Sequence, residues 1–146
     1  MSESIESVKE RFRYPDIKIE RGEFERVGDT FNVDTDALMF IAEEEGRLAP
    51  LNEDVWSVLD NTDSNQLKKG DWDSVKACSE AQARIRDWEK FKRLEENGVP
   101  VDAPIIMKFG DTYHLVAGNT RLMVARALGT TPKVLLFEYR HDRTNE

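Results

Sequence analysis

The chain has few of the residues from which disulfides and soft metal sites are built. Cys78 is its single cysteine, which excludes an internal disulfide and a cysteine-rich metal site. His114 and His141 are its only histidines, too few for a histidine-based zinc cluster. No metal ligand is therefore assigned. A metal would be held by oxygen ligands, as Mg²⁺ that arrives with a phosphate.

Long apolar runs are also missing. No stretch approaches the roughly 20 apolar residues of a membrane span, and no signal-peptide core follows Met1. We therefore expect no membrane partner and a reducing, cytoplasmic location.

The residues that are present suit a single folded domain, 1–146. The chain is 39% apolar and contains three Trp and seven Phe, which argues against general disorder. Residues 1–98 carry 15 Lys and Arg against 24 Asp and Glu, a net charge of −9, whereas residues 99–146 carry six against five, a net of +1. An acidic chain is a poor non-specific coat for DNA, although a local basic groove could hold one strand or one nucleotide. The acidic half offers an interaction surface for a homodimer or for a protein partner.

The most informative segment runs from Tyr113 to Gly129, YHLVAGNTRLMVARALG. Its first five residues alternate as in a half-buried strand, and Gly118 ends that alternation. Asn119 and Thr120 are good helix N-cap types, and an apolar residue then recurs every third position up to the stop signal Gly129. The segment therefore predicts a strand, a one-glycine turn and a helix.

Such a turn is suited to binding an anion. A helix N-terminus presents unpaired N–H groups and the positive end of the helix dipole, and a glycine lets a ligand approach the backbone. Gly118, Asn119, Thr120 and Arg121 thus form a candidate phosphate cradle, in which the Arg121 guanidinium binds two oxygens at once. On this hypothesis Arg121→Ala abolishes binding and leaves the fold intact. The alternative is a plain tight turn with a solvated arginine.

The segment and its flanks resemble the ParB/sulfiredoxin-like superfamily (ParB-like nuclease domain), whose core motif is a strand running into G-x-x-R. Gly118, Arg121, Ala125 and Gly129 stand at the matching places. The segments 104–108, 109–112 and 133–139 are similar to the family's preceding strand, its hairpin and its following strand. The resemblance covers about residues 100–140 and leaves 1–98 as a helical elaboration. Short stand-alone members of this kind occur in phage and mobile-element genomes.

The resemblance implies phosphate or nucleotide chemistry but not one reaction. Sulfiredoxins use a cysteine inside the G-x-x-R turn, where this chain has Asn119, so that activity is rejected. ParB proteins bind CTP at the motif, other relatives phosphorylate small substrates, and others are nucleases. We therefore expect binding of a nucleotide, such as CTP or ATP with Mg²⁺, or of a nucleic acid. Nuclease or nucleotide-hydrolysing activity is one option, in which Mg²⁺ and one upstream carboxylate would complete the site. A non-catalytic DNA-associated or host-directed module and a small-molecule kinase are the alternatives, and no catalytic residue is assigned.

Three further side chains are accessory candidates. His114 lies on the motif strand, and Glu43 and Glu44 belong to an acidic run at a predicted helix end, where the dipole disfavours negative charge. The predicted fold is a mixed α/β (α+β) domain. Its small mixed sheet is expected from 16–20, 104–109, 113–117 and 133–139, with a turn or hairpin in 24–31 and helices over 35–97, the longest of them running from about 71 to 97.

Overall fold

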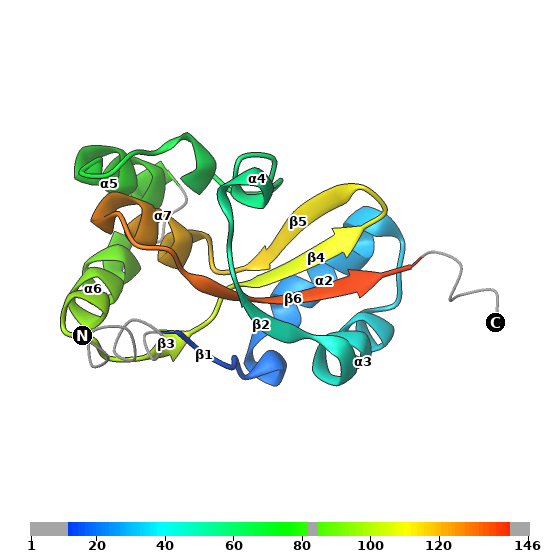
Figure 1. The fold of residues 1–146 in the computed structure, drawn as a ribbon. Coiled ribbons are helices and arrows are strands. Elements are labelled where there is room, and N and C mark those ends of the chain that lie inside the picture. The colour runs from blue at the N-terminus through cyan, green and yellow to red at the C-terminus, as the bar shows by residue number, and fades with distance from the viewer. Residues whose placement is uncertain (1–11, 82–84, 141–146) are drawn as a thin grey trace.

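The computed structural model describes residues 12–81 and 85–140 of the chain (Figure 1). Its strands are β1 (Phe12–Arg13), β2 (Arg47–Pro50), β3 (Val101–Asp102), β4 (Ile105–Phe109), β5 (Thr112–Ala117) and β6 (Lys133–Tyr139). Its α-helices are α2 (Arg21–Phe31), α3 (Thr35–Glu45), α4 (Glu53–Trp56), α5 (Trp72–Ala81), α6 (Ile85–Glu96) and α7 (Asn119–Leu128). Two short 3-10 helices are η1 (Ile17–Glu20) and η2 (Ser64–Gln66).

The main sheet is mixed and has the strand order β2-β6-β4-β5. The central strand β4 pairs antiparallel with β5, its hairpin partner, and parallel with β6. The edge strand β2 pairs antiparallel with β6. The prediction of a mixed α/β domain around a small mixed sheet is therefore confirmed, and its strands 104–109, 113–117 and 133–139 correspond to β4, β5 and β6.

Helices cover the sheet on both faces. Helices α2 and α3 pack on one face through a cluster that includes Phe24, Leu38, Met107 and Phe137. Helix α7 packs on the other face with Trp56, and α5 and α6 lie against α7 beyond the end of the sheet (Figure 1). None of the helices in the described ranges has the length and apolar character of a membrane span.

The expected strand at 16–20 is wrong. Ile17 and Ile19 alternate with charged residues, but the segment forms η1, because the Asp16 carboxylate accepts the N–H of Lys18 at 3.2 Å and closes a helical turn. Ile17 is buried and Ile19 is 74% exposed, so the alternation does not correspond to one face of a sheet. The fourth strand of the sheet is instead β2, which lies outside the four segments predicted as strands.

Two other predictions also need correction. The expected turn or hairpin in 24–31 is instead α2, a regular helix that passes through Gly28 and has as its C-cap Asn32, which takes the left-handed conformation with φ of 58°. The expected helix from 71 to 97 is two helices, α5 and α6, that contact each other. The rings of Trp72 and Trp88 lie 6.0 Å apart, whereas 16 residues of one straight helix would separate them by about 24 Å.

Candidate functional site

The turn between β5 and α7 requires a glycine for two independent reasons. Gly118 has φ of 109°, a backbone conformation that side chains with a Cβ rarely adopt. A Cβ added at Gly118 would also lie 2.6 Å from Cβ of Pro104, which precedes β4. Between Ile105 and Ile106 the pairing of β4 with β5 shifts register, so an irregularity of the sheet sits directly beside this turn.

The helix begins as the sequence predicts, but its cap differs. Gly118 is the N-cap, and the first intrahelical bond joins the N–H of Leu122 to the Gly118 carbonyl at 3.0 Å. The expectation that Asn119 or Thr120 caps the helix is therefore wrong. Because glycine has no side chain, Gly118 supplies no side-chain cap to the first turn of α7.

Asn119 is instead tied to the loop before η2. Its Oδ1 accepts the Thr62 hydroxyl at 2.6 Å and the N–H of Asp63 at 3.1 Å. The neighbouring Asn61 has φ of 67°, and its side-chain amide donates to the Leu115 carbonyl on β5 at 2.8 Å. These bonds fix the loop beside the start of α7 and form one wall of a cavity.

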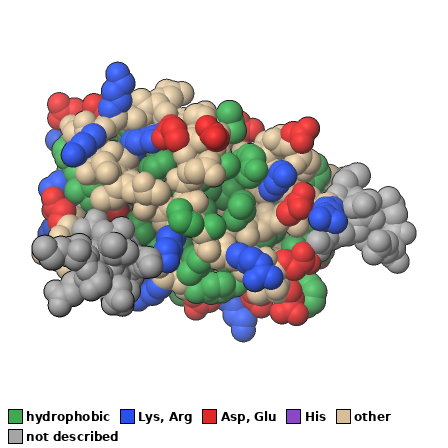
Figure 2. Space-filling view, viewed as in Figure 1, with side chains coloured by type: hydrophobic (Ala, Val, Ile, Leu, Met, Phe, Trp, Pro, Cys, Tyr) green, Lys and Arg blue, Asp and Glu red, His purple; other side chains and the backbone are tan. Residues whose placement is uncertain are grey.

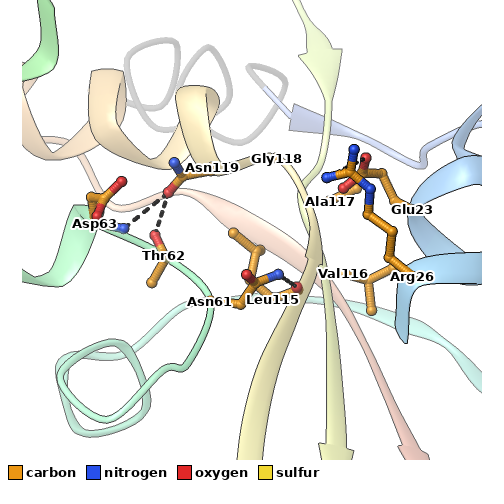
Figure 3. A pocket seen from close by; sticks show the side chains of 10 residues that line it. All are labelled: Glu23, Arg26, Asn61, Thr62, Asp63, Leu115, Val116, Ala117, Gly118 and Asn119. Carbon is orange, nitrogen blue, oxygen red and sulfur yellow. Dashed lines mark hydrogen bonds and ion pairs between the residues drawn. The ribbon is translucent and has the colours of Figure 1, made fainter. Parts of the chain in front are cut away.

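The cavity has a volume of about 560 Å³. Figure 3 shows its two walls: the loop and Asn119 on one side, Glu23 and Arg26 of α2 on the other, with the end of β5 between them. The residues that line it are Glu23, Arg26, Asn61, Thr62, Asp63, Leu115, Val116, Ala117, Gly118 and Asn119.

Arg26 supplies the positive charge of this cavity. Its side chain is 74% exposed, and Nη1 lies 4.0 Å from Oε1 of Glu23, a loose ion pair at spacing i,i+3 on α2. Sequence reasoning missed both residues, since it predicted a hairpin in 24–31. Helical spacing would have indicated that positions 23 and 26 share a face.

Arg121 does not line the cavity. Its Nη1 donates to the Asp102 carbonyl, its Nη2 lies 3.0 Å from Oε2 of Glu20, and its guanidinium lies over the Phe91 ring at 5.8 Å. The side chain is 11% exposed. The structure thus divides the predicted cradle: Gly118 and Asn119 line the cavity, Thr120 is buried, and Arg121 is held in an internal ion pair. Phosphate binding by the full set stays a prediction.

His114 lies in an adjoining pocket of about 390 Å³, which shares Glu23, Arg26, Asn61 and Val116 with the main cavity. Burial lowers the pKa of His114 below its usual 6.5, and the charge of Asp60 opposes that shift in part. The imidazole is therefore neutral at pH 7, and its ring meets the ring of Phe31 edge-on at 5.0 Å.

Glu43 and Glu44 are not brought to this site. Both line a separate pocket together with Tyr14 and Lys18, and the Tyr14 hydroxyl donates to the Glu43 carbonyl at 3.4 Å. Burial, and then the charges of the two glutamates, raise the pKa of Tyr14. Within the described ranges, no three His, Cys, Asp or Glu side chains converge in the manner of a metal site.

Comparison of the chain with family models, with curated proteins and with solved structures gives no match in any of the three. The site is therefore interpreted from its own residues.

Proposed function

We propose that the chain is a ParB/sulfiredoxin-like domain that binds a nucleotide with its phosphate at the turn between β5 and α7. The observation that carries the proposal is the cavity itself, in which the start of α7 at Gly118 and Asn119 lies opposite the Arg26 side chain. A helix N-terminus and a guanidinium on facing walls are a suitable pair of partners for one phosphate group.

The phosphate would contact the N–H groups at the start of α7 and be clamped by Arg26. Because the ion pair of Arg26 with Glu23 is long and the Arg26 side chain is mostly exposed, reorienting that side chain toward a ligand costs little. Gly118 allows the ligand to approach the backbone, since no Cβ stands in the way. In this arrangement Arg26 takes the phosphate-binding role that the sequence analysis gives to Arg121.

The polar lining suits the remainder of a nucleotide. Carboxylate and amide oxygens accept hydrogen bonds from ribose hydroxyls and from the amino groups of bases. Glu23, Asp63 and Asn61 supply such oxygens around the turn, and the adjoining pocket extends the groove to His114. The two volumes, about 560 and 390 Å³, lie in the usual range for small-molecule sites.

The order of elements supports the family proposal. Strands β4 and β5, the Gly118 turn, α7 and β6 follow one another as the resemblance requires, and Gly129 ends α7 with φ of 79°. The proposal is one of binding. Nuclease, nucleotide-hydrolysing and kinase activities remain options implied by the resemblance, without an assigned base.

Isothermal titration calorimetry with CTP and with ATP, each with and without Mg²⁺, tests the proposal. Arg26→Ala should weaken binding by at least about tenfold, the value of one charge-assisted contact of about 1.5–3 kcal/mol. Arg47→Ala on β2 removes the same charge away from the cavity and should leave affinity unchanged. Equal affinities for the wild-type protein and Arg26→Ala would refute the site, and chromatography of the incubated nucleotide would detect turnover.

A further inference from the structure

A second pocket lies at the other end of α7. It has a volume of about 490 Å³ and is bounded by the start of α4, the segment after η2 and the residues between α7 and β6. The side chains and backbone that line it are Leu51, Asn52, Glu53, Trp56, Asn65, Leu67, Lys68, Lys69, Arg126, Gly129, Thr130 and Thr131.

The charge of this pocket differs from that of the rest of the molecule. Lys68, Lys69 and Arg126 line it together with one carboxylate, Glu53, although the whole chain carries a net charge of −8. In four other pockets formed by residues 12–81 and 85–140, anionic side chains equal or outnumber cationic ones. Its local field therefore favours an anionic ligand.

Arg126 and Glu53 form a fixed, neutral wall. The Arg126 guanidinium stacks on Trp56 at 3.8 Å from the ring centre and binds both Glu53 oxygens, at 2.6 and 3.1 Å. Its Nε donates to the Ser64 carbonyl at 3.3 Å. These bonds lower the pKa of Glu53, so the pair stays ionised at neutral pH. The excess positive charge is that of the two lysines.

The fold fixes the backbone that carries these lysines. The N–H of Lys68 donates to Oδ2 of Asp71 at 2.7 Å, and the N–H of Gly70 donates to the Ala127 carbonyl at 2.8 Å. The stem of Lys69 lies where a side chain at position 129 would stand, since a Cβ on Gly129 would be 2.7 Å from Cδ of Lys69. Gly129 thus makes room for Lys69 at the pocket wall.

The last carbonyls of α7 lie at the negative end of the helix dipole, which disfavours an anion here, but those of Ala125, Arg126 and Ala127 accept hydrogen bonds that reduce this effect. Gly129 N–H donates to the carbonyls of Ala125 and Arg126, and Thr130 donates to Ala125 through both its N–H and its hydroxyl. Ala127 accepts the N–H of Gly70. Binding of an anion in the pocket therefore depends on the two lysines, whose charge offsets the remaining helix dipole.

We propose that this pocket is a second ligand site, separate from the turn at Gly118, and that it binds a small phosphorylated molecule. The phosphate oxygens accept from the ammonium groups of Lys68 and Lys69 and from the hydroxyl of Thr131, which is exposed at the pocket. The volume suits a ligand of about the size of a mononucleotide or a sugar phosphate.

Charge decides between a small ligand and a nucleic acid. At physiological salt, charges more than about 8 Å away are largely screened, so the electrostatic energy of a small anion inside the pocket is set mainly by the two lysines. A nucleic acid strand would extend over a larger part of the surface, and on the face seen in Figure 2 Lys and Arg side chains are intermixed with Asp and Glu. The strand therefore meets the repulsion of an acidic chain.

Two-dimensional amide NMR with inorganic pyrophosphate as the probe tests the site. We expect saturable shifts at Gly129, Thr130 and Thr131. The double variant Lys68→Gln/Lys69→Gln should weaken binding about tenfold, whereas Lys18→Gln/Lys76→Gln, which removes the same charge elsewhere, should not. Absence of shifts at 129–131, or equal weakening by the two double variants, would overturn the proposal.

The outcomes remain separable from those for the turn at Gly118. Arg26→Ala should leave the pyrophosphate shifts at 129–131 unchanged, so either site can fail alone. A short oligothymidylate should bind more weakly than pyrophosphate at these amides. Tighter binding of the oligonucleotide there would assign the pocket to nucleic acid and refute the small-ligand proposal.

Discussion

Replacement of Arg121 by alanine is expected to destabilise the fold, and the contacts of the guanidinium set the size of the effect. Arg121 is 11% exposed and its partner Glu20 is 22% exposed, so the variant leaves a mostly desolvated carboxylate without its cation. The Asp102 carbonyl also loses a donor. Breaking a fully buried pair costs about 3–5 kcal/mol, and the partial exposure of Glu20 reduces this to about 2–4 kcal/mol.

Urea unfolding followed by tryptophan fluorescence measures this loss, and Arg13→Ala provides the matched control. Arg13 pairs with the side chain of Asp102, the residue whose carbonyl accepts from Arg121, at 2.6 Å. The Arg13 side chain is 64% exposed, so its removal should cost less than about 1 kcal/mol. Adding Glu20→Gln to Arg121→Ala should recover part of the loss, because the orphaned charge is removed.

A loss below about 1 kcal/mol in Arg121→Ala, with no coupling to Glu20, would refute this reasoning. It would mean that the guanidinium is not held by Glu20 and is available to a ligand at the turn. The sequence-based expectation of an intact fold in this variant would then stand.

Three other variants test the same region. Gly118→Ala should cost about 2–4 kcal/mol of stability in a thermal melt, because alanine is strained in this left-handed backbone conformation and its Cβ meets Pro104. The control Gly110→Ala, with φ of 60° and open space around the new Cβ, should cost about 1 kcal/mol. Equal losses in the two variants would contradict the role of the close approach to Pro104. Leu122→Ala, at a fully buried position on α7, should cost about 2–5 kcal/mol in urea, and a loss under about 1 kcal/mol would show that the α7 face is not core. The pKa of His114 lies below 6.5 in the folded protein, so the unfolded chain binds the proton first as the pH falls. The melting temperature should therefore decrease as the pH is lowered from about 6.5, and the decrease should be smaller in His114→Gln. Identical pH profiles for the two proteins would refute this prediction.

The second half of the chain was predictable because its signals are local. Alternation over 113–117, the glycines at 118 and 129 and the apolar spacing between them specify a strand, a turn and a helix without reference to the rest of the chain. Each of these elements also agrees with the tertiary packing, so local preference and global fold coincide.

The predictions from sequence fail where tertiary contacts determine the local structure or the partner of a side chain. The pairing of Glu20 with Arg121 joins residues 101 positions apart, and no local pattern indicates it. Strand β2 is a strand because β6 offers it a partner, not because its four residues favour one. Arg26 was missed for a similar reason, since its position opposite Gly118 depends on where α2 packs on the sheet.

The internal ion pair of Arg121 also determines how the protein can be divided. A recombinant fragment beginning near residue 100 would contain the whole motif that resembles a known family, yet it would lack Glu20 and the β2 edge of the sheet. We expect such a truncation to be insoluble or molten when expressed alone. Minimal versions of this domain should therefore be sought by shortening its loops rather than by removing the segment that precedes the motif.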